Sequence, residues 1–230
     1  MKREVVSEKI KETIQQATEK EPVRDLLLPD IVVTKPRELL IRNAGGKKTL
    51  RFSTTFINQG VGPLEIIGHS DKDKGVTYAA QYISEAGGPG LYRDMGSFVF
   101  HPEHNHWHVG DYVFYQLFQK GKNDQILAST DKMSFCIWDE DKQDLSLAVA
   151  SPVRVYTSNC GRQIQGMSVG WSDTYLARVE GQEMNITGIP DGVYVFRSIV
   201  NPDKKIREND YDNNTYDVEI EIVGNRLTVK

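Results

Sequence analysis

Four of the five histidines in this 230-residue chain fall within eight positions, at His101, His104, His106 and His108. In an extended strand, side chains at every second position share a face, so His104, His106 and His108 would project together. The aromatic and β-branched run 112–115 that follows favours a strand. Three neutral imidazoles on one face predict a site for copper, zinc, iron or nickel, and not for magnesium or calcium.

The histidine cluster is also compatible with different kinds of site. An exposed histidine run can bind metal without having a function. A closed structural zinc site would need a fourth protein ligand, which His101 or Asp111 could supply. A cupin-like iron dioxygenase agrees less well with the sequence, because no glutamate shortly follows His106 and His108 and no further histidine lies downstream.

The chain has two cysteines, Cys136 and Cys160, which can form one disulfide. Such a bond would close a loop of 24 residues and contribute about 3 kcal/mol to stability by restricting the unfolded chain. Both cysteines would usually be free in a reducing cytosol and paired in an exported or hyperthermophile protein. Pairing is the favoured interpretation, and neither cysteine lies in a motif typical of a catalytic nucleophile.

From Leu26 onward the sequence consists of short β-type runs separated by glycine, proline and asparagine. This pattern is typical of an antiparallel sandwich and differs from alternating strands and helices. The expected strands include residues 31–34, 38–42, 50–56, 193–200 and 215–223. The sequence therefore predicts a mainly β fold, an antiparallel β-sandwich with long loops, in which a strand carries the histidines.

The first twenty residues are charged and have Val6, Ile10 and Ile14 spaced along one face of a helix. Pro22 and Pro29 would end this short N-terminal helix. The segment lacks the apolar core of a signal peptide, so the chain is expected in the cytoplasm unless an export signal was removed.

Length and a hydrophobic content of 39% indicate one main core. We therefore expect an N-terminal helical extension at residues 1–25 and one catalytic domain at residues 26–230. The net charge of -4, without a basic stripe, gives no sign of a nucleic-acid partner. No apolar run is long enough for a membrane segment.

Several short motifs follow one another from the histidines to the C-terminus. They are His104-Asn-His106-Trp-His108, Lys132-Met-Ser-Phe-Cys136, Cys160, Gln165-Gly-Met-Ser, Asp173-Thr-Tyr175, Gly192-Val-Tyr-Val-Phe, Val200-Asn-Pro202 and Glu208-Asn-Asp-Tyr-Asp-Asn-Asn214. Each motif is short, but together they are specific, and their order resembles that of the lysyl oxidase catalytic domain. The resemblance covers roughly residues 28–223.

The resemblance implies a copper-dependent oxidase that acts on primary amines, including peptidyl lysine. By likeness to the family, His104, His106 and His108 would bind copper(II), and Lys132 and Tyr175 would be oxidised and cross-linked into lysine tyrosylquinone. Molecular oxygen would be the second substrate, and an aldehyde, ammonia and hydrogen peroxide would be the products. Free diamines, other small amines and lysines of another protein all remain open as substrates.

The family also has a disulfide that matches Cys136 and Cys160, and a calcium site near the C-terminus. The matching calcium ligands are Asp30, the Ile31 carbonyl, Glu208, Asp210, Asn213 and Asn214. Closely spaced carboxylate and amide oxygens suit calcium, although Asn and Asp also form turns without an ion. A calcium ion here would join the first strand to the C-terminal part of the chain.

The chain departs from the animal enzymes at two points. It lacks their additional cysteines, and Tyr115 stands where they have a histidine seven residues after the last copper ligand. No acid or base role can be transferred from that histidine, and Asp111 and Asp173 both remain candidates for the catalytic base. The alternative function is that of a copper- or zinc-binding β-sandwich protein that forms no quinone.

Overall fold

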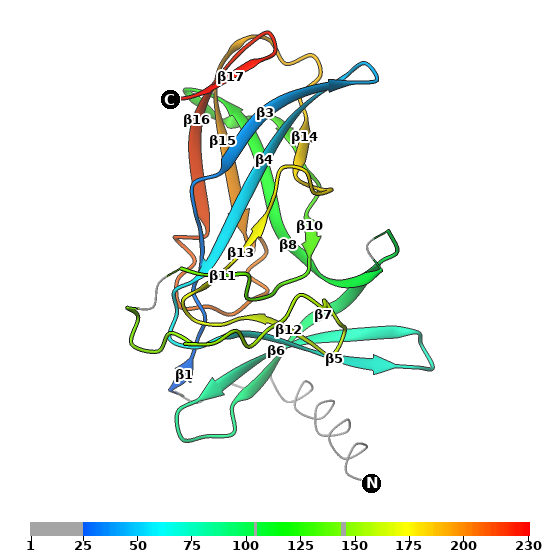
Figure 1. The fold of residues 1–230 in the computed structure, drawn as a ribbon, viewed down its shortest axis with the longest axis vertical. Coiled ribbons are helices and arrows are strands. Elements are labelled where there is room, and N and C mark those ends of the chain that lie inside the picture. Colours follow the sequence, from blue (N-terminus) through cyan, green and yellow to red (C-terminus); the bar gives the residue numbers. More distant parts are fainter. Residues whose placement is uncertain (1–24, 104, 144–145) are drawn as a thin grey trace.

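The computed structural model describes residues 25–103, 105–143 and 146–230. Within these ranges no residue is helical, and antiparallel strands form two sheets (Figure 1). The prediction of a mainly β, antiparallel fold is therefore confirmed. The expected N-terminal helix falls on residues 1–24, which lie outside the described residues.

The larger sheet contains eleven strands. In chain order they are β1 (Leu26–Leu27), β5 (Leu64–Asp71), β6 (Val76–Glu85), β7 (Leu91–His101), β8 (His106–Gln119), β9 (Lys122–Ser129), β10 (Met133–Phe135), β12 (Ile164–Met167), β15 (Gly192–Val200), β16 (Thr215–Val223) and β17 (Arg226–Val229). The order across the sheet is β12-β5-β6-β7-β8-β15-β16-β17, with β1 beside β6 and both β9 and β10 beside β8. Strand β8, which carries two of the histidines, thus lies in the middle of this sheet.

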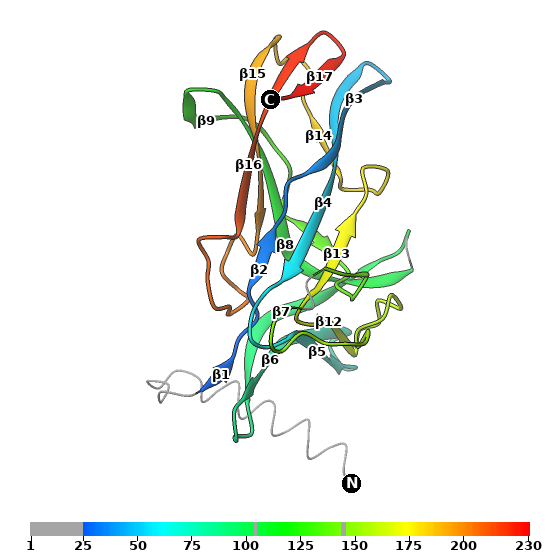
Figure 2. The ribbon, with the colours of Figure 1, turned by 60° about the vertical axis from the view of Figure 1, so that its left-hand side comes forward.

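The smaller sheet contains six strands. They are β2 (Ile31–Val33), β3 (Arg37–Ala44), β4 (Lys47–Asn58), β11 (Asp141–Lys142), β13 (Trp171–Tyr175) and β14 (Glu183–Asn185). Strand β4 is its centre, because β2, β3, β13 and β14 all pair with it. Figures 1 and 2 show this sheet lying over β8, β15 and β16 of the larger one.

Aromatic side chains join the two sheets at the core. Phe52 of β4 contacts Tyr115 and Phe196 of the larger sheet, with ring centroids 4.5 and 4.6 Å apart. Phe56, also on β4, lies edge-on to Tyr112 of β8 at 5.5 Å. All five rings are almost fully buried. Such pairs contribute about 0.5–1.5 kcal/mol each beyond the burial of their area, and they hold β8 in place relative to β4 and its neighbour β13.

Alternation along the sequence predicted several of these strands correctly. In β16, Val218, Ile220 and Ile222 are buried, as the two-residue period requires. The turn between β3 and β4 contains Gly45 and Gly46, both with positive φ, a conformation that glycine adopts without strain. A glycine turn therefore separates the two strands that were expected at residues 38–42 and 50–56.

The histidine segment is a hairpin, so the expectation of a single strand through it is wrong. Strand β7 ends at His101 and β8 begins at His106, and these two residues pair across the hairpin. Pro102 cannot donate a hydrogen bond to a neighbouring strand. Asn105 has a φ of 54°, a left-handed conformation that asparagine tolerates. The turn therefore interrupts the strand just before the last two histidines.

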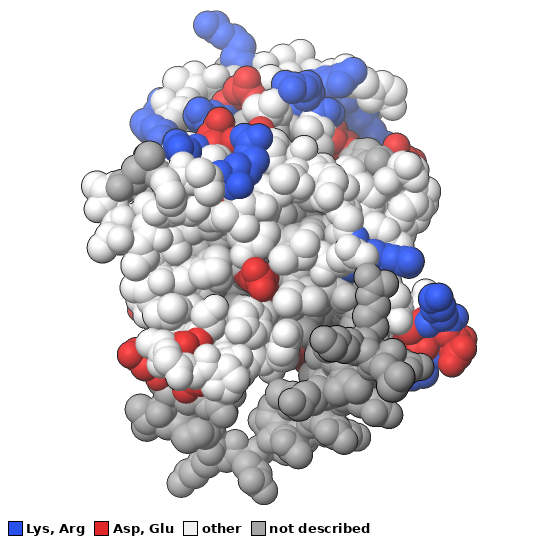
Figure 3. Space-filling view, turned by 60° about the horizontal axis from the view of Figure 1, so that its bottom comes forward, with Lys and Arg blue, Asp and Glu red and all other residues white. Residues whose placement is uncertain are grey.

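No helix in the described ranges is long and apolar enough to cross a membrane. On the face seen in Figure 3, lysine and arginine side chains gather mainly along the upper edge, while most of the centre is uncharged.

Candidate functional site

A cavity of about 320 Å³ lies between β8, β10, β13 and the loop that follows β13. Its titratable lining residues include His101, His106, His108, Asp173, Tyr175 and Glu180. These residues come from two segments far apart in the sequence, 101–108 and 173–180, so the fold is required to bring them together. The cavity is the candidate site for chemistry, because it combines metal-ligand types with a buried phenol.

His106 and His108 project from β8 on one face, as the period of a strand requires. Their Nε2 atoms are 2.7 Å apart, and the ring of His101 stacks on that of His108 at 5.0 Å. His104, the third expected ligand, lies outside the described residues. Two imidazole nitrogens that face each other at this distance can bind one ion together, so the described part of the cluster fits copper or zinc.

Tyr175 ends β13 and its ring lies in the cavity wall, with the Phe135 ring stacked on it at 3.9 Å. Its phenolic oxygen is 2.6 Å from Oδ2 of Asp173 and 2.5 Å from the backbone oxygen of Cys136. Burial, together with the charge of Asp173, raises the pKa of Tyr175 well above its usual range. The phenol therefore stays protonated unless a base or a cation assists its ionisation.

Lys132 lies outside this cavity. It precedes β10 and is exposed, and its ammonium group forms an ion pair with Asp203, at 2.6 and 2.7 Å from the two carboxylate oxygens. The hydrogen bond to Asp203 raises the pKa of Lys132. Met133, the next residue, does line the cavity. The structure thus brings the described histidines together with Tyr175, and it places the second expected cofactor residue elsewhere.

The predicted disulfide between Cys136 and Cys160 is present, and both cysteines are buried. The backbone oxygen of Cys160 accepts a hydrogen bond from the Trp107 N–H at 2.9 Å, between the two β8 histidines. The backbone oxygen of Cys136 accepts the bond from Tyr175 described above. The disulfide therefore connects the histidine strand to the tyrosine.

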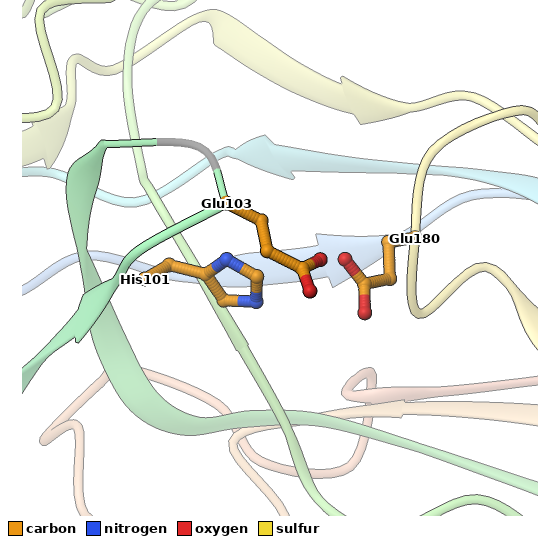
Figure 4. A group of neighbouring side chains, drawn as sticks. All are labelled: His101, Glu103 and Glu180. Carbon is orange, nitrogen blue, oxygen red and sulfur yellow. The ribbon is translucent and has the colours of Figure 1, made fainter.

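A second group of ligand types is formed by His101, Glu103 and Glu180, whose side chains lie close together in Figure 4. His101, Glu103 and Glu180 each offer a ligand atom, and these atoms lie within 4.8 Å of one another. Imidazole and carboxylate groups bind transition metals and also attract ammonium ions. Glu103 could have been noticed from its place between the histidines, whereas Glu180 lies far along the chain and gave no sequence signal.

The residues expected to bind calcium lie close together where the first strand of the smaller sheet contacts the C-terminal segment. Glu208 is buried, and its carboxylate accepts hydrogen bonds from the Ile31 N–H at 2.9 Å and from the Asn214 amide at 2.6 Å. Oδ1 of Asp30 accepts a hydrogen bond from the Asn213 amide at 2.8 Å. The first strand and the C-terminal segment are therefore joined by these side chains.

Two observations at this second site fit a cation. Burial, and then the nearby Asp210 carboxylate, raise the pKa of Asp30. Within the described residues, the Oδ1 atoms of Asn213 and Asn214 are buried and accept no hydrogen bond. Unsatisfied buried oxygens are rare in folded proteins, and oxygen donors near carboxylates are what calcium binds.

Tyr115 packs in the core between the two sheets. Its side chain is fully buried, and its hydroxyl contacts Thr54 Oγ1 at 2.7 Å and accepts a hydrogen bond from Gln182 Nε2 at 3.0 Å. Burial raises its pKa. Tyr115 is therefore part of the core between the sheets. It does not line the cavity, although the animal enzymes have a histidine at the matching position.

The fold and site define a class of β-sandwich protein with a histidine cluster and a buried tyrosine in one cavity. A family model described as Lysyl oxidase matches residues 89–230, which is more than half of the chain. The chain therefore belongs to the lysyl oxidase family.

Curated relatives agree with this assignment. The chain is 31% identical to lysyl oxidase homolog 4 of Homo sapiens over 132 residues, which are 57% of this chain and 16% of the relative. It is 31% identical to protein-lysine 6-oxidase of Rattus norvegicus over 133 residues, 57% of this chain and 30% of the relative. The matched region thus spans less than a third of the length of either relative.

Proposed function

We propose that this protein is a copper-dependent amine oxidase whose catalytic domain is residues 26–230. The observation that carries the proposal is that His106, His108 and Tyr175 line one cavity in a chain of the lysyl oxidase family. The proposed reaction converts a primary amine, molecular oxygen and water into an aldehyde, ammonia and hydrogen peroxide. The similarity to a protein-lysine 6-oxidase supports a lysine side chain of a protein as the substrate, and free diamines and other small amines are further candidates.

His104, His106 and His108 would hold copper(II). Bound there, copper would supply redox chemistry with molecular oxygen next to Tyr175. The protein's own part is to hold the phenol ring in position, through the Phe135 stack and the hydrogen bonds of its hydroxyl. The surrounding side chains also restrict access of solvent to the ring, which is 8% exposed.

Lys132 and Tyr175 would supply the organic cofactor, lysine tyrosylquinone. An amine acts as a nucleophile only when it is neutral, so Lys132 must lose its proton and leave Asp203 before it can bond to the ring. Lys132 directly precedes β10, whose first residue, Met133, lines the cavity. To bring Lys132 to Tyr175, only the few residues before β10 have to move, and β10 itself does not have to unfold.

Peptide mass mapping tests this function. The protein is prepared without metal and then exposed to copper and oxygen. The proposal expects a covalent Lys132–Tyr175 peptide, labelling by phenylhydrazine, and peroxide production with a panel of amines that includes diamines and lysine peptides. A mass without the cross-link, together with no peroxide from any amine, would refute the oxidase and favour the alternative.

That alternative is a copper- or zinc-binding β-sandwich protein that forms no quinone. The ion pair of Lys132 with Asp203, outside the cavity, is the observation that favours it. In that case copper binding would still require the histidines, and the intact mass of the protein would stay unchanged after treatment with copper and oxygen.

We also propose that Asp30, the Ile31 carbonyl, Glu208, Asp210, Asn213 and Asn214 bind calcium. The unsatisfied amide oxygens and the raised pKa of Asp30 support this proposal. The ion would have a structural role, because these residues are not among those that line the cavity with Tyr175.

A further inference from the structure

The phenolic oxygen of Tyr175 has two close acceptors but only one proton. These acceptors are Oδ2 of Asp173 and the backbone oxygen of Cys136. The Cys136 carbonyl cannot take up the proton at neutral pH, whereas a carboxylate can. Asp173 is therefore the contacting group that can change the protonation state of Tyr175.

The Asp173 side chain is fixed in place, and one of its oxygens is unsatisfied. It is 1% exposed, it lines the cavity, and Oδ2 accepts a hydrogen bond from the Trp138 N–H at 3.3 Å. Its Oδ1 is buried and makes no well-formed hydrogen bond with any described residue. Carboxylates with a purely structural role normally have both oxygens satisfied. Oδ2, the oxygen that contacts the Tyr175 hydroxyl, is thus the one placed to take up its proton.

The other nearby carboxylates are placed differently. Asp111 forms an ion pair with Lys205 at 2.6 Å, its side chain is 43% exposed, and it is not one of the cavity-lining residues. Glu140 does line the cavity, but its carboxylate accepts the backbone N–H of Thr174 at 2.9 Å. Of the two aspartates that the sequence left open as the base, only Asp173 touches a reacting group.

We propose that Asp173 is a catalytic base that removes the phenolic proton of Tyr175 before the ring is oxidised. This inference rests on the proposed function and assigns a step within it. The O–H bond of Tyr175 breaks, its electron pair stays on the phenolic oxygen, and the proton bonds to Oδ2 of Asp173. No electron is transferred in this step. The oxidant that acts afterwards is molecular oxygen, and a phenolate gives up electrons more readily than a phenol.

The proposal predicts a direction for the pH dependence. Burial raises the pKa of Asp173 well above its usual range, and the charge of Glu140 adds to this. Tyr112 of β8 is the other ionisable group whose charge is coupled to Asp173, and His106 and His108 line the same cavity. Only the ionised carboxylate accepts a proton, so the rate of cofactor formation should rise with pH through the raised pKa of Asp173.

The first experiment follows the Lys132–Tyr175 cross-link by mass over time after copper and oxygen are added to metal-free protein. Asp173→Asn keeps the shape of the side chain and removes the base. We expect the cross-link to form about 10²–10⁴-fold more slowly, a range typical of general base catalysis. It should also lose the part of its rise with pH that comes from Asp173, while the part that comes from deprotonation of Lys132 remains. Asp217→Asn is the control and should form the cross-link at the wild-type rate, because Asp217 pairs with Arg197 between β15 and β16 and is not among the residues that line the cavity.

A second measurement needs neither copper nor turnover. Nuclear magnetic resonance of protein labelled at the tyrosine Cζ carbon reports the hydrogen bond of each phenol, and Tyr175→Phe identifies the Tyr175 signal. In the wild type this signal should move as the Asp173 carboxyl titrates, and in Asp173→Asn it should not. Formate added to Asp173→Ala should also restore part of the cross-linking rate, by replacing the missing carboxylate.

The outcomes separate this inference from the function on which it rests. If wild-type protein forms no cross-link, the oxidase proposal fails and the role of Asp173 fails with it. If the wild type forms the cross-link and Asp173→Asn does so at the same rate and with the same pH dependence, only the role of Asp173 is overturned. If Asp173→Asn does not fold, a wild-type Tyr175 signal that stays constant through the carboxyl titration overturns it instead.

Discussion

The ammonium nitrogen of Lys132 lies 2.6 Å from one oxygen of the Asp203 carboxylate and 2.7 Å from the other. This ion pair holds Lys132 outside the cavity in which Tyr175 is buried. Asp203 thereby acts on the lysine in two ways. It fixes the side chain away from the ring, and its hydrogen bond raises the pKa of Lys132, which keeps the amine protonated.

Removal of the Asp203 charge should therefore accelerate cofactor formation. In Asp203→Asn, the pKa of Lys132 falls toward its ordinary value and the side chain is free to move. We expect the Lys132–Tyr175 cross-link to form severalfold faster, and its rise with pH to begin at lower pH. The measurement is the half-time of cross-linking by mass after copper and oxygen are added. Because the pair is exposed, little change in unfolding temperature is expected.

Asp217→Asn is the control for this prediction. Asp217 forms an equally short ion pair with Arg197, at 2.7 Å, between β15 and β16. Loss of that pair should leave the cross-linking rate unchanged. A rate in Asp203→Asn that is equal to or slower than wild type would contradict the role given to Asp203.

Substitution of either cofactor residue should abolish the quinone and preserve the metal site. Tyr175→Phe removes the phenol, and Lys132→Arg removes the nucleophilic amine. Neither variant should show quinone absorbance or phenylhydrazine labelling, while copper content remains at the wild-type level. Tyr175→Phe should also lower the free energy of unfolding by about 1–2 kcal/mol, because it leaves buried hydrogen-bond partners unsatisfied. Amine turnover with peroxide release in Tyr175→Phe would show that the cofactor assignment is wrong.

Local sequence pattern was sufficient to predict much of the fold. Strand β16 has the alternating side chains that a half-buried strand requires, and paired glycines mark the turn between β3 and β4. Strand β4 was also expected from its alternating sequence, although all its residues from Phe52 to Asn58 are buried. The hairpin at His101 was missed because a histidine at every second position looks like one strand. The proline and the left-handed Asn105 that form the turn are single residues, and no periodicity reveals them.

The site was predictable only as far as its motifs extend. The types and spacing of the histidines already indicated a metal site, and the two cysteines a disulfide, whereas the role of Tyr175 was expected only from the family resemblance. Asp203 and Glu180 lie in no such motif. Each is far in sequence from the residue that it contacts, and the contact depends on how the sheets and loops fold together. The position of Lys132 likewise depends on a long-range ion pair that no local pattern contains.

Loss of a β8 histidine should reduce copper binding. His108 is almost fully buried and its Nε2 faces that of His106, so His108→Ala removes a donor that solvent cannot easily replace. We expect copper affinity to fall by at least tenfold and the cross-link to disappear. His69→Ala, in β5, is the control, and this variant should bind as much copper as the wild type. Metal analysis after dialysis measures both. Wild-type copper affinity in His108→Ala would exclude the site.

Calcium should stabilise the protein through Asp30 and its neighbours. A ligand that binds only the folded state adds about 2.7 kcal/mol at 100 times its dissociation constant, so the unfolding temperature should rise by several degrees in calcium and fall in a chelator. Asp30→Asn should abolish this response. The control is Asp73→Asn, in the exposed turn after β5, which should retain it. An identical response to calcium in wild type and Asp30→Asn would refute the site.

The disulfide should affect both stability and cofactor formation. It closes a loop of 24 residues, so replacement of both cysteines by serine should lower the free energy of unfolding by about 3 kcal/mol in urea titrations. The carbonyl of Cys136 also accepts the Tyr175 hydroxyl, and that of Cys160 accepts the Trp107 N–H on the histidine strand. Without the bond, Tyr175 is less firmly held beside the histidines, so cross-linking should slow under conditions in which the variant is still folded. A variant that loses stability but cross-links at the wild-type rate would limit the disulfide to a structural role.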